Sequence, residues 1–129
     1  MAPLEEPSAS LEIEFAALRS ERGVLRLCLT RDPASFPDCH DDAVAITRTV
    51  PATVASLRLE RLAPGAYALA VIHDENGNAR LDTFAGIPRE GFGFSQNPAV
   101  GFGPPRFAAA RFSLPAEGAT QRVRLRYLL

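Results

Sequence analysis

Short oxygen-bearing side chains recur at every second position of the stretch HDENGNARLD, which follows an apolar segment. Counted from its first aspartate, they fall at positions 1, 3, 5 and 9, with an arginine at position 7. EF-hand loops bind calcium through these five positions, and position 7 uses its backbone carbonyl, so an arginine fits there. The spacing therefore predicts a Ca²⁺ site, with ligands Asp74, Asn76, Asn78, Arg80 and Asp82.

Two positions depart from that template. Position 6, where the template has glycine, holds Ala79, and position 12, where it has a bidentate glutamate, holds Ala85. We therefore expect a weak site with a structural role, with a Kd on the order of 10⁻⁴–10⁻³ M. The alternative is a metal-free hairpin, because Asn76-Gly77 favours a type I′ turn.

A second group able to do chemistry is His73, which lies where the apolar segment meets this loop. A buried structural histidine is one interpretation, and an enzyme that uses His73 with nearby carboxylates is the other. Ser95 has no G-x-S-x-G setting, which argues against a serine nucleophile.

The two cysteines, Cys28 and Cys39, are the third such group. A disulfide between them would persist in an oxidising compartment and would contribute about 2–3 kcal/mol to stability. Two reduced thiols are the alternative, and with His40, Asp41 and Asp42 they would suit a transition metal.

The fourth candidate is the Phe/Gly-rich segment 84–107, where periodicity is weak. Exposed aromatic side chains there would form a platform for a partner or a small ligand. The alternative is that they fold back and fill the protein interior. The candidate ligand-binding residues are Phe92, Phe94, Phe102 and Phe107.

Seven short segments read as strands, and none reads convincingly as a helix. Alternation is clear in LEIEF and VLRLCLT, which look like a hairpin, and AYALAVIH is apolar on both faces, as in a central strand. The pattern predicts an all-β fold, a single antiparallel β-sandwich of about seven strands. The predicted segments are 11–15, 24–30, 43–50, 53–62, 66–73, 110–114 and 121–128.

The Pro-Gly turn at Pro64-Gly65 delivers Tyr67 to the start of the central strand. We expect a structural tyrosine there, whose hydroxyl bonds back to nearby backbone. In the last strand, Arg122, Arg124 and Arg126 alternate with apolar residues. They form either a solvated strand face or a patch for an acidic ligand.

The bulk composition narrows the class of protein. The length of 129 residues suits one domain, which we place at 11–129 after a disordered leader at 1–10. The net charge of −1 gives no electrostatic reason to expect nucleic-acid binding. No apolar run approaches the ~20 residues that span a bilayer.

Two stretches of the chain resemble the DUF2141 family. They are LAPGAYALAVIHDENGNARLDTFAGIPREGFGFSQNP and GFGPPRFAAARF. The resemblance extends over 11–129 and is densest over 62–112, and the family loop has glycine where this chain has Ala79. The family comprises small bacterial proteins that usually carry an export signal and have no established activity. It implies a transthyretin-like (prealbumin-like) sandwich, a periplasmic or secreted location, and a signal peptide removed before this sequence begins.

These observations combine into one functional expectation. The chain is an exported, non-enzymatic domain with a weak calcium loop, and it binds an unknown protein or small molecule, or gives support, at the cell envelope. The alternatives are a metal-free binding module that uses segment 84–107, and an enzyme that uses His73.

Overall fold

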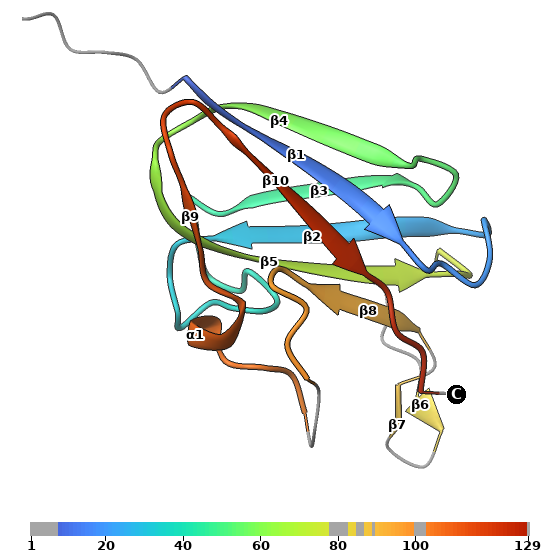
Figure 1. Cartoon of the computed structure of the whole chain (residues 1–129). Coiled ribbons are helices and arrows are strands. Elements are labelled where there is room, and N and C mark those ends of the chain that lie inside the picture. The colour runs from blue at the N-terminus through green and yellow to red at the C-terminus, as the bar shows by residue number, and fades with distance from the viewer. Residues whose placement is uncertain (1–7, 78–82, 85–86, 89, 100–102, 129) are drawn as a thin grey trace, which may run out of the picture.

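Two β-sheets form most of the protein (Figure 1). The computed structural model describes residues 8–77, 83–84, 87–88, 90–99 and 103–128. The strand order is β10-β1-β4 in the smaller sheet and β3-β2-β5-β8 in the larger, where β9 also pairs with β5. Buried residues from both sheets belong to one apolar cluster, so the sheets pack face to face in a sandwich-like arrangement.

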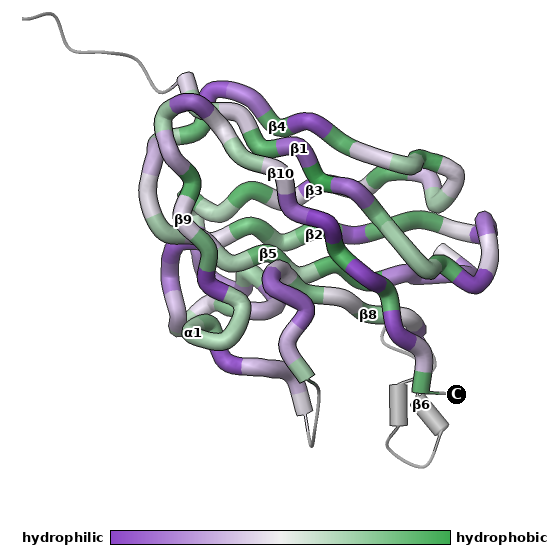
Figure 2. The backbone as a smooth tube through the Cα atoms, in the orientation of Figure 1, coloured by the Kyte–Doolittle hydropathy of each residue, from purple (hydrophilic) through white to green (hydrophobic). Residues whose placement is uncertain are grey.

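The three-stranded sheet is built around β1 (Ala9–Ala16), which lies between β4 (Ser56–Leu62) and β10 (Ala119–Arg124). Leu11 and Ile13 of β1 are fully buried, while Glu12 and Glu14 lie on the other face. Figure 2 shows the resulting alternation of hydrophobic and hydrophilic residues along β1 and β10. The β1–β4 pairing is antiparallel, as are the pairings within the larger sheet, in agreement with the prediction of antiparallel sheets. β1 and β10, however, pair in parallel.

The larger sheet is built around β5 (Gly65–Asp74), which pairs with β2 (Val24–Thr30) along one side. β2 pairs in turn with β3 (Ile46–Pro51). The other side of β5 is shared by two strands, β9 (Phe112–Leu114) near its start and β8 (Gly91–Phe94) near its end. The short strands β6 (Thr83–Phe84) and β7 (Ile87–Pro88) pair with each other, and α1 spans Phe107–Ala110.

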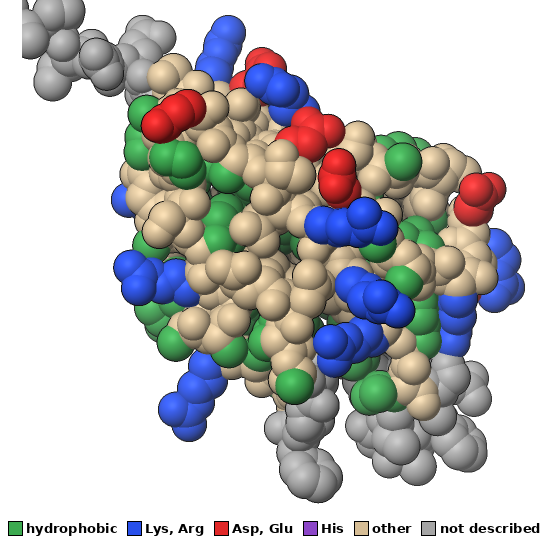
Figure 3. Space-filling view, viewed as in Figure 1, with side chains coloured by type: hydrophobic (Ala, Val, Ile, Leu, Met, Phe, Trp, Pro, Cys, Tyr) green, Lys and Arg blue, Asp and Glu red, His purple; other side chains and the backbone are tan. Residues whose placement is uncertain are grey.

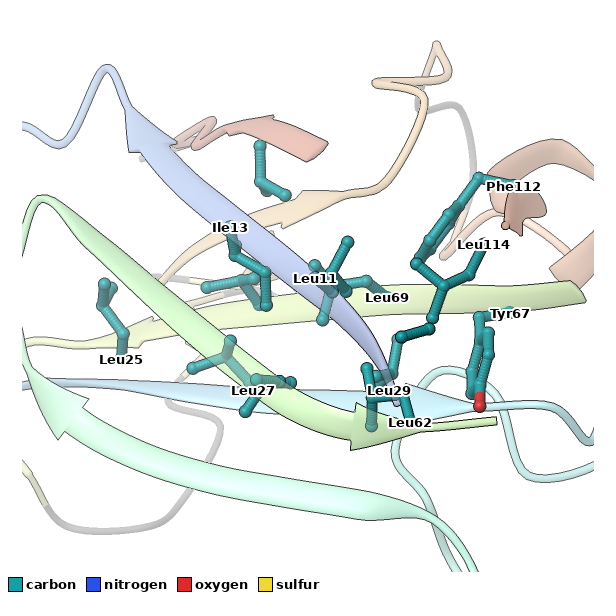
Figure 4. Packing of buried hydrophobic residues seen from close by; sticks show 14 of the residues in the cluster. Leu11, Ile13, Leu25, Leu27, Leu29, Leu62, Tyr67, Leu69, Phe112 and Leu114 are labelled. Atoms are coloured by element: carbon teal, nitrogen blue, oxygen red, sulfur yellow. The ribbon is translucent and has the colours of Figure 1, made fainter. Parts of the chain in front are cut away.

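Leucines dominate the core between the sheets (Figure 4). Leu25 and Leu29 of β2 and Leu69 of β5 meet Leu11 and Ile13 from the opposite sheet. Each is at most 1 % exposed, and burying such a side chain stabilises the fold by about 1.5–3 kcal/mol. His73 lies four residues after Leu69 in β5. Because alternate residues of a strand share a face, His73 is on the same inner face as Leu69.

Tyr67 closes a corner at the start of β5. Its hydroxyl donates a hydrogen bond to the carbonyl of Ala63, four residues back, at 2.7 Å. Its ring is 4 % exposed and stacks on Phe112 with 6.3 Å between centroids. These contacts match the structural role expected for this tyrosine.

Several sequence-based expectations require correction. The segments LEIEF and VLRLCLT do not form a hairpin, because β1 and β2 lie in different sheets. The described residues contain ten strands rather than about seven, and the additional ones, β6, β7 and β8, lie in the Phe/Gly-rich region. β3 ends at Pro51, one residue beyond the predicted segment 43–50, and it is an edge strand, where a missing N–H is tolerated.

The first strand begins at Ala9, two residues before the predicted start, and Ala9 is fully buried. Residues 1–7 of the predicted leader lie outside the described residues. Within the described part of the chain, no helix is long and apolar enough to cross a membrane.

Candidate functional site

The predicted cation loop begins at Asp74, the last residue of β5. The Asp74 side chain is on the outer face of the large sheet, is 1 % exposed, and pairs with the Arg26 guanidinium at 3.0 Å. Its backbone carbonyl accepts a hydrogen bond from the N–H of Gly77 at 3.2 Å, so residues 74–77 form a tight turn. Glu75 and Asn76 are the central residues of this turn, whereas a type I′ turn would have centred on Asn76-Gly77.

The other predicted ligands cannot be placed. Asn78, Arg80 and Asp82 lie outside the described residues, and only Asp74 and Asn76 lie within them. Among the described residues, no group of three or more His, Cys, Asp or Glu side chains could hold a metal ion. The calcium site therefore stays a prediction.

Glu75 joins β5 to the loop that connects β1 and β2. Its carboxylate accepts hydrogen bonds from the Arg19 guanidinium at 2.6 and 2.9 Å, from the Ser20 hydroxyl at 2.7 Å and from Arg22 at 3.1 Å. Burial acts to raise the pKa of Glu75, but the donors Arg19 and Ser20 and the charge of Arg19 outweigh it and lower the pKa to about 2.

His73 lies beside this cluster and is fully buried. Its Nε2 is 2.7 Å from the carbonyl oxygen of Arg22, which can only accept, so Nε2 carries a proton. In the neutral ring, Nδ1 then accepts the hydroxyl proton of Tyr127 at 2.7 Å. Both ring nitrogens are therefore hydrogen-bonded within the protein, as expected for a buried structural histidine.

Tyr127 receives further contacts from Arg19. The backbone N–H of Arg19 donates to the Tyr127 hydroxyl at 3.2 Å, and its guanidinium lies 4.5 Å from the ring centroid. Burial raises the pKa of Tyr127 above its usual value, Glu75 adds to that rise, and Arg19 opposes it. The hydroxyl thus keeps the proton that it donates to His73.

This network of Arg19, Ser20, Arg22, Glu75, His73 and Tyr127 was not found from the sequence. Its members come from the β1–β2 loop, the end of β5 and the segment after β10, and most are separated by more than 50 residues. No local spacing could reveal it.

The motif Gly91-Phe92-Gly93-Phe94 has a packing explanation. A Cβ on Gly91 would overlap the Tyr127 ring, and a Cβ on Gly93 would lie 2.6 Å from Val123 Cγ1. The glycines therefore face inward and let β8 approach the C-terminal segment, where Phe92 and Arg126 exchange backbone hydrogen bonds. The phenylalanines consequently point to the outer face of the large sheet.

On that outer face, aromatic residues form a second apolar cluster. Phe36 packs edge-on against Phe94 and Phe107, with ring centroids 5.9 and 6.1 Å apart. Phe94 is 7 % exposed, and Phe92 and Phe107 are partly buried. These three side chains neither plug the space between the sheets nor form an open platform; Phe102 lies outside the described residues.

A disulfide between Cys28 and Cys39 belongs to the same cluster. Cys28 is on β2, Cys39 is in the loop that follows it, and their Cα atoms are 5.7 Å apart. The bridge holds the loop with Phe36 over the outer face. Because the sulfurs are bonded to each other, the alternative of two thiolates that bind a transition metal is not supported.

Two polar groups, buried Ser95 and partly exposed Asp42, make hydrogen bonds beside this layer. The Ser95 hydroxyl donates to the Ala110 carbonyl at 2.5 Å and accepts the N–H of Leu69 at 2.9 Å. Asp42 accepts hydrogen bonds from Thr30 and Ser35, which lower the pKa of its carboxyl. Both groups serve the packing of the cluster rather than an open site.

An open hollow of about 400 Å³ lies between the β1–β2 loop and the β3–β4 turn. Phe15, Leu18 and Val54 supply apolar walls, and Ser20 and Thr53 supply hydroxyls. The hollow is open to solvent over much of its extent, unlike clefts that bury most of a small ligand. No sequence pattern predicted this hollow, since its lining comes from two loops that are distant along the chain.

Comparison with known proteins places the chain in a family. Residues 13–122 match the model of DUF2141, described as an uncharacterized protein conserved in bacteria. This chain is a DUF2141 protein. The suspected membership is thereby confirmed. The match covers most of both sheets, the outer cluster and the network around Glu75 except Tyr127. No curated protein and no solved structure matches the DUF2141 chain.

Proposed function

We propose that this DUF2141 protein is an exported domain of the bacterial cell envelope that acts by binding or structural support rather than by catalysis. The observation that carries the proposal is the Cys28–Cys39 disulfide. Disulfides persist in oxidising compartments outside the cytosol. A periplasmic or secreted location is therefore the setting in which this structure is stable.

We propose a role without catalysis because two reactive side chains, His73 and Ser95, are buried and already hydrogen-bonded. His73 is fully buried with both nitrogens bonded, and Ser95 is fully buried with its hydroxyl bonded to backbone on both sides. Neither side chain could reach a substrate without breaking these contacts.

We also propose that the two sheets form a transthyretin-like sandwich. A core shared by two sheets and the Tyr67 corner support this assignment. An experimental structure whose strand order and connections differ from those of transthyretin would exclude it.

The loop after β5 is proposed to hold Ca²⁺ in a structural role. The turn at 74–77 keeps Asp74 and Asn76 close together at the start of the loop. Arg26 already pairs with the Asp74 carboxylate, so a cation would have to share it. This competition is a further reason to expect weak affinity, with a Kd on the order of 10⁻⁴–10⁻³ M.

Thermal melts in EDTA and in excess CaCl₂ test the cation loop. Calcium at about 100 times its Kd adds about 2.7 kcal/mol, so Tm should rise by several degrees in the wild type. The rise should be lost in Asp82→Asn, which leaves the described contacts of Asp74 intact. Arg26→Gln is the matched control, because it breaks the Asp74 ion pair but keeps every predicted ligand; its calcium-dependent rise should persist.

An unchanged wild-type Tm would reject the cation and leave segment 74–82 as a turn and loop without metal. The proposal of an exported binding domain would then rest on the disulfide alone, since it does not depend on calcium.

The hollow between the β1–β2 loop and the β3–β4 turn favours a second candidate, small-ligand binding at this end of the protein. Val54→Trp would fill the hollow, whereas Val44→Trp would add the same ring at an exposed position elsewhere. Fragments that shift the NMR signals of Leu18 and Val54 should stop binding only in Val54→Trp. If no fragment shifts these signals, this candidate fails.

A further inference from the structure

Three arginines of the C-terminal region share one face of the molecule. Arg122 and Arg124 of β10 are exposed, Arg126 follows them and is partly exposed, and Val123 and Leu125 between them are buried. Alternate residues of an extended chain are about 7 Å apart, so the guanidinium groups form a row with that repeat. Figure 3 shows arginine side chains in a line over the end of β10 and the segment after it.

These guanidinium groups have no acidic partner in the part of the chain that the structure describes. The ion pairs found there use other cations, namely Arg19, Arg22, Arg26, Arg58 and His40. Three positive charges on one strand repel one another weakly unless an anion lies beside them. The row is thus charged and available at the surface.

The surroundings of the row differ on its two sides. On one side β1 presents Glu12 and Glu14, with Glu14 in register with Arg122. On the other side Asn97 meets β10: its side-chain amide donates to the Arg122 carbonyl at 2.9 Å, and its oxygen accepts the Arg124 N–H at 2.9 Å. The neighbouring described residues 91–97 on that side include no acidic residue.

This asymmetry restricts the shape of an anionic partner. A flat anionic surface such as a membrane would have to cover the glutamates of β1 together with the arginines. A single extended chain could lie along the edge strand and contact the arginines alone. Guanidinium groups bind carboxylate, sulfate and phosphate groups through paired hydrogen bonds, which suits a linear polymer with regularly spaced anions.

We propose that the outer face of β10 binds an extended anionic polysaccharide through Arg122, Arg124 and Arg126. The polymer runs along the strand on the side of Asn97, and each arginine pairs with one anionic group. This inference does not depend on calcium binding or on the location of the protein, because the three arginines alone form the proposed binding surface.

The experiment measures binding of fluorescein-labelled heparin, a sulfated polysaccharide, by anisotropy at several NaCl concentrations. The test variant is Arg122→Gln/Arg124→Gln/Arg126→Gln. The matched control is Arg48→Gln/Arg61→Gln/Arg106→Gln, which removes three positive charges from exposed residues elsewhere. Circular dichroism and thermal melts establish that both variants are folded. If the triple variant does not fold, the single variant Arg124→Gln is tested in its place.

We expect the test variant to lose about tenfold or more in affinity and most of the salt dependence, while the control stays close to the wild type. Equal losses in the two variants would show that only net charge matters, and would overturn the proposal. Unchanged binding in the test variant would show that the polysaccharide does not bind through these arginines, and would also overturn the proposal. Stronger binding to vesicles with anionic phosphatidylglycerol than to heparin would overturn the choice of partner.

Discussion

At the scale of single residues, Glu75 shows how the chain uses its charged groups. Its carboxylate binds Arg19, Ser20 and Arg22, so that β5 is tied to the β1–β2 loop. The same loop carries the carbonyl that fixes His73. Charge and hydrogen bonds here stabilise the arrangement of loops at one end of the sheets.

The low pKa of Glu75 gives a pH-dependent stability. The pKa is 4.5 for the free side chain and about 2 in the folded protein, so the folded state binds the proton less tightly. This contribution is complete above pH 4.5 and is lost as the pH falls towards about 2. Urea denaturation between these pH values should show the wild type losing more stability than Glu75→Gln.

Glu117→Gln provides the control for that titration, since Glu117 is exposed in the turn before β10. Its stability should fall with pH in parallel with the wild type. If Glu75→Gln also follows the wild-type curve, the network around Glu75 does not form in solution.

At the scale of elements, β8 shows why glycine alternates with phenylalanine. Gly91 and Gly93 allow close approach to the C-terminal segment, and Phe92 and Phe94 build the outer cluster. One strand thereby closes the space between the sheets and supports the layer outside them.

Replacing Gly91 by alanine tests this packing. The added Cβ would overlap the Tyr127 ring, and we expect a loss of about 1–3 kcal/mol, measured by urea denaturation. Tyr127→Ala removes the ring, so Gly91→Ala should cost little in that background. Additive effects in the double variant would contradict the contact between Gly91 and Tyr127.

The strands that the sequence predicted best are those with one clear buried face. VLRLCLT coincides with β2, because alternating leucines fix the register of a half-buried strand. β8 was missed because glycine carries no hydrophobic signal, although its inward face needs glycine. The pairing of β1 with β10 and β4 was missed because long-range pairing depends on the opposite sheet, not on local pattern.

The candidate site was less predictable for the same reason. Asp74 lies at the predicted place, but its partner Arg26 is on a neighbouring strand 48 residues away. The disulfide was one of two open alternatives, because sequence spacing alone does not show whether two cysteines point towards each other.

At the scale of the whole molecule, the two sheets present different outer faces. The larger sheet is partly covered by the disulfide loop and α1, which bury a second apolar cluster. The smaller sheet carries charged residues on its outer face, including the arginine row. The outer face of the larger sheet is therefore partly buried, whereas that of the smaller sheet is charged and exposed.

The disulfide is the structural feature on which the proposed location of the protein rests. It holds the loop from β2 over the outer cluster and contributes about 2–3 kcal/mol by restricting the unfolded chain. In a reducing cytosol this contribution would be absent, and this is the structural reason for the proposed export.

The most direct test is the thiol state of the protein in fractions of the bacterium that makes it. Cells are lysed in iodoacetamide, and intact masses are measured in the envelope, secreted and cytosolic fractions before and after reduction. We predict that the protein is in the envelope or secreted fraction and that both cysteines, Cys28 and Cys39, are alkylated only after reduction. Protein found in the cytosolic fraction with both cysteines alkylated before reduction would contradict the account.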